Sequence, residues 1–182
     1  MSVANLKNYN PTKGKIFLFD ANIWIALCWP DYQHFSTNHS DLISTFLDKC
    51  IKMKCKILLP SIVVSEIINR IFRNEHKLYS QNNHPLNYKD FRKTTAATDV
   101  IKDIRTVFLS QLIRLEERGV IEKIEDSFFE FSISTALEQL NQIDFNDLLI
   151  LEICKKQDIY LVTNDSDLLK MKETIPMLTS LY

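Results

Sequence analysis

Acidic residues follow apolar runs at several widely separated places in this sequence. Asp20 comes directly after the run 16–19, and Asp165 comes just after a second apolar run near the carboxyl end. Glu66 lies about a turn beyond a third run, and Asp147 opens the segment that leads into the last one. An acid just past a buried strand lies at the carboxyl edge of a parallel sheet, where open α/β folds bind their ligands. Carboxylates gathered there would repel one another unless a cation neutralised them, so the sequence predicts a divalent metal site.

Taken one at a time, these acids also have structural explanations. Asp20 could cap the helix that follows it, and Glu66 could pair with Arg70 one turn further along its helix. Asp144 and Asp165 could each cap a short helix near the carboxyl end. It is the joint placement of the acids after apolar runs that favours a site over separate caps.

The elements that would position these acids alternate along the chain. Strands are expected at 16–19, 56–59, 120–124 and 159–162, with a fifth near 177–179. Helices are expected at 21–28, 41–53, 61–73, 95–118, 127–140 and 145–157, and Gly119 stands where a C-terminal cap belongs. Short apolar strands separated by helical segments predict an α/β fold, a parallel sheet of four to five strands with helices on both faces. A length of 182 residues suits a single domain.

The segment 79–93 interrupts this alternation with polar, basic and aromatic residues. Six Arg or Lys residues stand against two acids between residues 70 and 93. Cations that meet phosphates and rings that stack on bases suit single-stranded nucleic acid, although polar loops of this composition also occur without a ligand. The candidate RNA-binding residues are Arg70, Arg73, Lys77 and Arg92.

The bulk composition is that of a soluble globular protein, with 46% hydrophobic and 25% charged residues. The net charge of −1 gives no global attraction for nucleic acid, so binding would need a local patch. The four cysteines form no CxxC pair and are expected to be buried and reduced. Asp20 and Asn22 interrupt the apolar run that imitates a signal peptide, and no run is long enough to span a bilayer. We therefore expect a cytoplasmic protein without a membrane partner.

Four blocks of the sequence together resemble the PIN-domain nucleases. They are Asp20 with Asn22 after the first strand, Glu66 in the helix after the second, the run Asp147-Leu148-Leu149-Ile150, and the run Thr163-Asn164-Asp165-Ser166-Asp167. The resemblance spans nearly the whole chain. It implies one PIN-like domain over residues 1–182, with 79–93 as an excursion, and a metal-dependent endoribonuclease activity. The VapC-like toxins are one subgroup of this family to which the chain could belong.

The resemblance also implies roles for individual residues. Asp20, Asp147 and Asp165 would bind Mg²⁺ or Mn²⁺, with Asp167 adding charge or a further ligand. Glu66 would orient or deprotonate the attacking water and contribute to the metal site. The side chains that would orient these carboxylates are Asn22, Thr163 and Asp144, of which Asp144 is also explained as a helix cap. One ion or two would satisfy the pattern.

Partners and alternatives follow from the same resemblance. Many PIN-domain members are toxins held by a small antitoxin that blocks the acidic pocket, often as toxin dimers, so the expected partners are RNA, an antitoxin and a second copy. One alternative is a PIN-like scaffold that binds RNA or protein without cutting. Another is a haloacid-dehalogenase-like phosphatase, although such enzymes carry an aspartate where this chain has Asn22.

Overall fold

The computed structural model describes most of the chain. The described residues are 3–29, 37–82, 85–126, 143–157, 159–172 and 174–181, with the single positions 128, 132, 134, 138, 140 and 141. Most of the helix expected over 127–140 therefore lies outside the described residues.

The structure is built on a parallel sheet of six strands in the order β1-β6-β5-β2-β3-β4. The strands are β1 (Val3–Asn5), β2 (Ile16–Phe19), β3 (Lys56–Pro60), β4 (Ile121–Ile124), β5 (Tyr160–Val162) and β6 (Met177–Thr179). In the central register, Leu18 of β2 is paired with Leu58 of β3 and with Leu161 of β5. The α/β fold with a parallel sheet is confirmed, but the sheet has one strand more than predicted.

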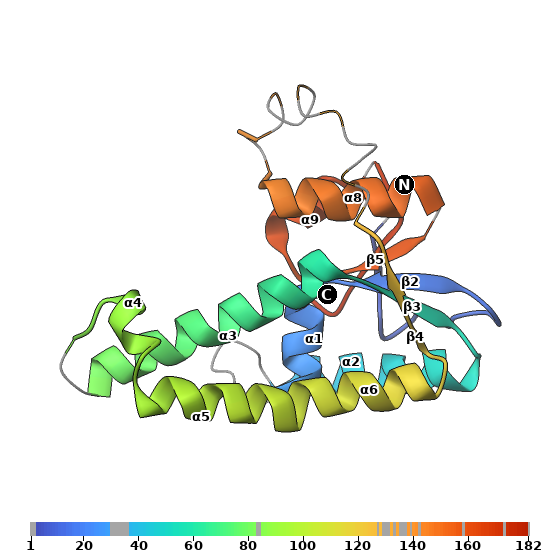
Figure 1. Cartoon of the computed structure of the whole chain (residues 1–182). Helices are drawn as coiled ribbons and strands as arrows, with labels where there is room; N and C mark the ends of the chain where they lie inside the picture. The colour runs from blue at the N-terminus through green and yellow to red at the C-terminus, as the bar shows by residue number, and fades with distance from the viewer. Residues whose placement is uncertain are drawn as a thin grey trace.

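Helices cover both faces of this sheet, as expected. They are α1 (Ala21–Cys28), α2 (Thr37–Lys52), α3 (Ser61–Asn82), α4 (Tyr88–Phe91), α5 (Thr95–Asp103), the π-helical turn η1 (Ile104–Leu109), α6 (Ser110–Glu117), α8 (Phe145–Gln157) and α9 (Ser166–Lys170). Figure 1 shows α8 and α9 on one side of the sheet and α1, α2 and α6 on the other.

The helix expected over 95–118 forms as the continuous rod α5–η1–α6. It ends at Gly119, whose φ of 67° and whose N–H bond to the carbonyl of Glu116 make the predicted cap. The wider π turn in the middle of the rod changes which residues face inward, because it holds more residues per turn than an α-helix. Phe108 is fully buried, whereas its neighbour Val107 is 42% exposed.

Residues 79–82 and 85–93, the described parts of the segment 79–93, lie at the far end of a helical hairpin that extends from the sheet (Figure 1). Helix α3 runs to Asn82, nine residues beyond the end predicted at residue 73. The rings of His76 and Tyr79 both pack on the ring of Phe91 in α4. The centroid of the Phe91 ring lies 5.3 Å from that of His76 and 5.4 Å from that of Tyr79, and Phe91 is only 1% exposed. Phe91 belongs to the hydrophobic core of the protein, and Tyr79 and Tyr88 pack against that core, so the aromatic side chains of this segment have structural roles.

The main core lies around β2. The rings of Phe17 and Phe46 meet edge to face at 5.3 Å, and Phe19 packs on Trp24 at 5.5 Å. All four cysteines are buried and free, as the sequence predicted. None of the helices within the described ranges is long and apolar enough to cross a membrane.

Candidate metal centre

The fold brings the predicted acids to the carboxyl ends of three adjacent strands. β5, β2 and β3 are neighbours in the sheet, and Asp165, Asp20 and Glu66 come after them in that order. Asp147 lies in the first turn of α8, the helix that leads into β5. Burial raises the pKa of Asp147, and the charges of Asp144, Asp20, Asp165 and Glu66 raise it further, so Asp147 interacts electrostatically with the other acids. We call Asp20, Glu66, Asp147 and Asp165 the acidic cluster.

Asp20 is the most tightly held member of the acidic cluster. Its side chain is 2% exposed, and its Oδ1 accepts a hydrogen bond of 2.6 Å from the N–H of Ala21 as the cap of α1. Its Oδ2 accepts from the hydroxyl of Thr163 at 2.7 Å and from the side-chain amide of Asn22. Burial nevertheless raises the pKa of Asp20 above its ordinary value, against the lowering effect of these bonds. The predicted cap and the predicted site residue are one and the same.

Thr163 and Asn22 link Asp20 to the residues that follow β5. The Thr163 hydroxyl also accepts from the N–H of Asp165 at 2.9 Å, and the Asn22 carbonyl oxygen accepts from the N–H of Asn164 at 3.1 Å. One hydrogen-bonded chain thus fixes the ends of β2 and β5 relative to each other, which orients the carboxylates that follow them.

Asp165 contributes one oxygen to the helix and one to the acidic cluster. Its Oδ1 caps α9 by accepting from the N–H groups of Asp167 and Leu168 at 2.8 and 3.4 Å. Its Oδ2 lies 4.0 Å from Nη2 of Arg70. Asp167, predicted as a further ligand, instead forms an exposed ion pair with Lys170 at 2.6 Å. The structure therefore brings Asp165 into the cluster and leaves Asp167 at its margin.

Glu66 is paired at one oxygen only. Its Oε1 lies 2.7 Å from Nη2 of Arg70, one turn further along α3, and its Oε2 is buried without a hydrogen-bond partner. Burial raises the pKa of Glu66 to about 6, opposed by Arg70 and reinforced by Asp20, Asp144 and Asp165. A carboxyl group with such a pKa exchanges its proton close to neutral pH.

Asp147 is also strongly perturbed by its surroundings. It is 9% exposed, and burial raises its pKa to about 8, with Asp144 the largest of the neighbouring charges that add to the effect. Asp144 itself accepts a hydrogen bond of 2.9 Å from the N–H of Asp147, as an N-terminal cap would. Asp144 thus has the capping position that the sequence allowed, while its charge also reaches Glu66.

The donor atoms of the acidic cluster suit a hard divalent cation. Carboxylate oxygens are the ligands that Mg²⁺ and Mn²⁺ prefer, and the orphaned Oε2 of Glu66 is an oxygen that such an ion would satisfy. Burial and, to a lesser extent, repulsion between the acids raise the pKa of Glu66 and Asp147, and a cation would offset both effects. Over the described ranges, no three His, Cys, Asp or Glu side chains are already arranged as a metal-binding group. The residues fit the ion chemically, and binding would require the side chains to draw together.

Asn164 is a supporting residue that sequence reasoning missed. Its Oδ1 accepts from the hydroxyl of Thr179 at 2.8 Å and from the N–H of Ser180 at 3.0 Å, and its Nδ2 donates to the Ser180 hydroxyl at 2.8 Å. The N–H of Asn164 also donates to Asn22, which in turn donates to Asp20. Asn164 therefore connects β6 to the hydrogen bonds that hold Asp20. Its position between Thr163 and Asp165 was the signal available in the sequence.

Asn164→Ala is expected to lower the free energy of unfolding by about 1–3 kcal/mol, because it leaves buried partners without hydrogen bonds. Equilibrium unfolding in urea would measure the loss. The control is Asn69→Ala, since Asn69 is exposed and makes only a 3.5 Å bond to Ser65. Equal stability of the two variants would show that the Asn164 network contributes little.

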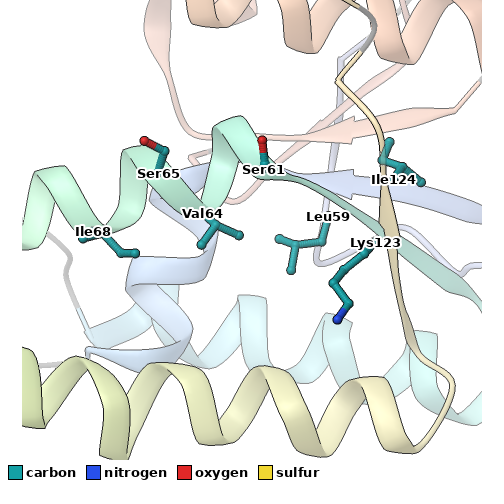
Figure 2. Close-up of a pocket in the computed structure, with 7 residues that line it drawn as sticks. All are labelled: Leu59, Ser61, Val64, Ser65, Ile68, Lys123 and Ile124. Carbon is teal, nitrogen blue, oxygen red and sulfur yellow. The ribbon is translucent and has the colours of Figure 1, made fainter.

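A separate hollow lies beside β3 and the first turns of α3, with a volume of about 510 Å³. Figure 2 shows its apolar wall, formed by Leu59, Val64, Ile68 and Ile124, with Lys123 alongside. No member of the acidic cluster is among the described residues that line it. The cluster and this hollow are therefore different features of the surface.

Comparison with known proteins supports the fold. No protein-family model matches the sequence, and no curated protein matches it significantly. The structure is similar to a chain in the crystal structure of VapBC2 from Rickettsia felis bound to a DNA fragment from their promoter, with a TM-score of 0.52 and 20% identity, covering 90% of this chain and 98% of that chain. It also matches the crystal structure of PAE2754 from Pyrobaculum aerophilum, with a TM-score of 0.42 and 17% identity over 95% of this chain and 90% of that chain. The VapBC2 match shows that the chain has a PIN-like fold, as its sequence motifs predicted.

Proposed function

We propose that this PIN-like chain is a ribonuclease that hydrolyses RNA with Mg²⁺ or Mn²⁺ at the acidic cluster. The observation that carries the proposal is a group of buried carboxylates that interact electrostatically. Their burial and mutual repulsion raise the pKa of Asp147 to about 8. Such an arrangement destabilises the folded state unless a positive ligand compensates it. Perturbed acids concentrated at the carboxyl edge of a parallel sheet are typical of functional sites.

Each acid has a distinct part in this proposal. Asp20, Asp147 and Asp165 would hold the cation, and Asn22 with Thr163 would keep the Asp20 carboxylate in place. When bound, the metal would lower the pKa of a water molecule and neutralise charge on the phosphate. Glu66, with a pKa of about 6, would orient that water and accept its proton.

Basic residues along α3 would contact the RNA. Arg73 and Lys77 are exposed and follow Glu66 along the helix toward the hairpin end. Arg92 lies over the ring of Phe72 at 4.6 Å, which holds its guanidinium near the same helix. Exposed cations of this kind bind phosphates without reading sequence, so they suit single-stranded or structured RNA of varied sequence.

A toxin role within a toxin–antitoxin pair is the setting that the fold favours, since the structural neighbour is a VapBC2 complex. In that setting the partner would be a small antitoxin protein, and the toxin could form a dimer. The ion pair between Arg70 and Glu66 favours the alternative of a scaffold that binds without cutting, because it already neutralises part of the cluster.

The direct test is to incubate the protein with a labelled single-stranded RNA, with Mg²⁺ or Mn²⁺ and with EDTA. We expect RNA fragments with either metal and none with EDTA, because the acids alone supply no cation to the phosphate. DNA of the same sequence and a small phosphomonoester serve as comparison substrates. Phosphate release from the monoester without RNA cleavage would favour the phosphatase alternative, and no cleavage of any substrate would favour the scaffold.

A further inference from the structure

Arg70 lies among the acids that are proposed to bind the metal. Its Nη2 is 2.7 Å from Oε1 of Glu66 and 4.0 Å from Oδ2 of Asp165, so one guanidinium approaches acids from two different elements. The charges of Asp20 and Asp147 act on it as well. All four members of the acidic cluster therefore interact electrostatically with the same positive side chain.

The position of Arg70 conflicts with that of a divalent ion. It engages Oε1 of Glu66 and approaches Oδ2 of Asp165, and these oxygens belong to the set that would have to turn toward a metal. Its side chain is 40% exposed whereas that of Glu66 is 13% exposed, so the arginine lies on the solvent side of this acid. Two cations that share the same ligand oxygens also repel each other, and this repulsion is strong in a partly desolvated site.

We propose that Arg70 is the chain's own counter-ion for the acidic cluster and that it must release Glu66 and Asp165 before a divalent cation binds. This inference rests on the proposed metal-dependent function. It explains why the described carboxylates are not already arranged around a common point, since Arg70 holds the Glu66 side chain. The arginine thereby lowers the affinity for metal and stabilises the protein without it.

The test is a titration of the full chain with Mn²⁺, with free Mn²⁺ followed by electron paramagnetic resonance. Arg70→Gln is expected to lower the dissociation constant for Mn²⁺ by about tenfold or more, because it removes a competing positive charge. The matched control is Arg105→Gln, which removes the same charge from the exposed face of η1 and should leave the affinity within about twofold of the original. Circular dichroism in EDTA would establish that each variant is folded.

Arg70→Lys is the second variant, for the case that Arg70→Gln does not fold. Lysine keeps the charge but lacks the planar fork, so it should hold Glu66 less firmly and raise Mn²⁺ affinity by a smaller factor, about threefold. Unchanged or weaker Mn²⁺ binding by the folded Arg70 variants, while the original chain binds Mn²⁺ and cleaves RNA, would overturn this inference alone. Failure of the original chain and every variant to bind Mn²⁺ would overturn the inference and the proposed function together.

Discussion

Asp20→Asn is expected to lower the rate of the proposed metal-dependent RNA cleavage by about a thousandfold or more. The substitution keeps the size of the side chain and can still accept the bond from the N–H of Ala21, but it removes the negative charge at the centre of the support network. A metal ligand that loses its charge loses most of its affinity for a hard cation, and the transition state loses that cation's stabilisation.

Single-turnover cleavage of RNA in Mn²⁺ measures this effect. Asp48→Asn is the matched control, since Asp48 is an exposed acid on α2 and its loss should leave the rate within about twofold. If expression of the chain arrests growth, Asp20→Asn should relieve the arrest and Asp48→Asn should not. Cleavage by Asp20→Asn at the original rate would remove the acidic cluster from the mechanism.

The convergence of the acids could be predicted because it depends on few rules. Each acid follows or leads into an apolar strand, and parallel strands present their carboxyl ends at one edge. The order β5-β2-β3 then places Asp165, Asp20 and Glu66 next to one another. The pairing of Glu66 with Arg70 was also foreseeable, because residues four apart on a helix are neighbours.

Other features depend on contacts between distant parts of the chain, which no local pattern reveals. β1 has three residues and pairs only with β6, at the opposite end of the sequence. Helix α3 continues past residue 73 because aromatic side chains on its last turns pack on Phe91 of α4. The approach of Arg70 to Asp165 requires that α3 and the end of β5 lie side by side. The ion pair between Asp167 and Lys170 is a local contact, three residues apart on α9, that was not predicted from the sequence.

The charge of Asp147 should make the metal-free protein less stable as the pH rises. The pKa of Asp147 is raised to about 8 in the folded state from an ordinary value of 3.8, so between these values the folded state binds a proton that the unfolded state has released. The free energy of unfolding must then fall with increasing pH over this range. The pKa of Glu66, raised to about 6, adds to the same trend at the lower end.

Asp147→Asn should remove the part of this dependence that Asp147 contributes, while the raised pKa values of Asp20 and Glu66 remain. Because asparagine carries no charge, we expect the variant to be more stable than the original chain by on the order of 2 kcal/mol at about pH 8 in EDTA, and of similar stability near pH 5. Urea unfolding across this pH range measures both slopes, with Asp48→Asn as the control that keeps the original slope. Mn²⁺ should stabilise the original chain at pH 8 and have little effect on Asp147→Asn, since a ligand stabilises only the folded state that binds it. A flat profile for the original chain, or a variant less stable at pH 8, would mean that Asp147 is already compensated without a metal, and the cluster would then have no electrostatic need for a cation.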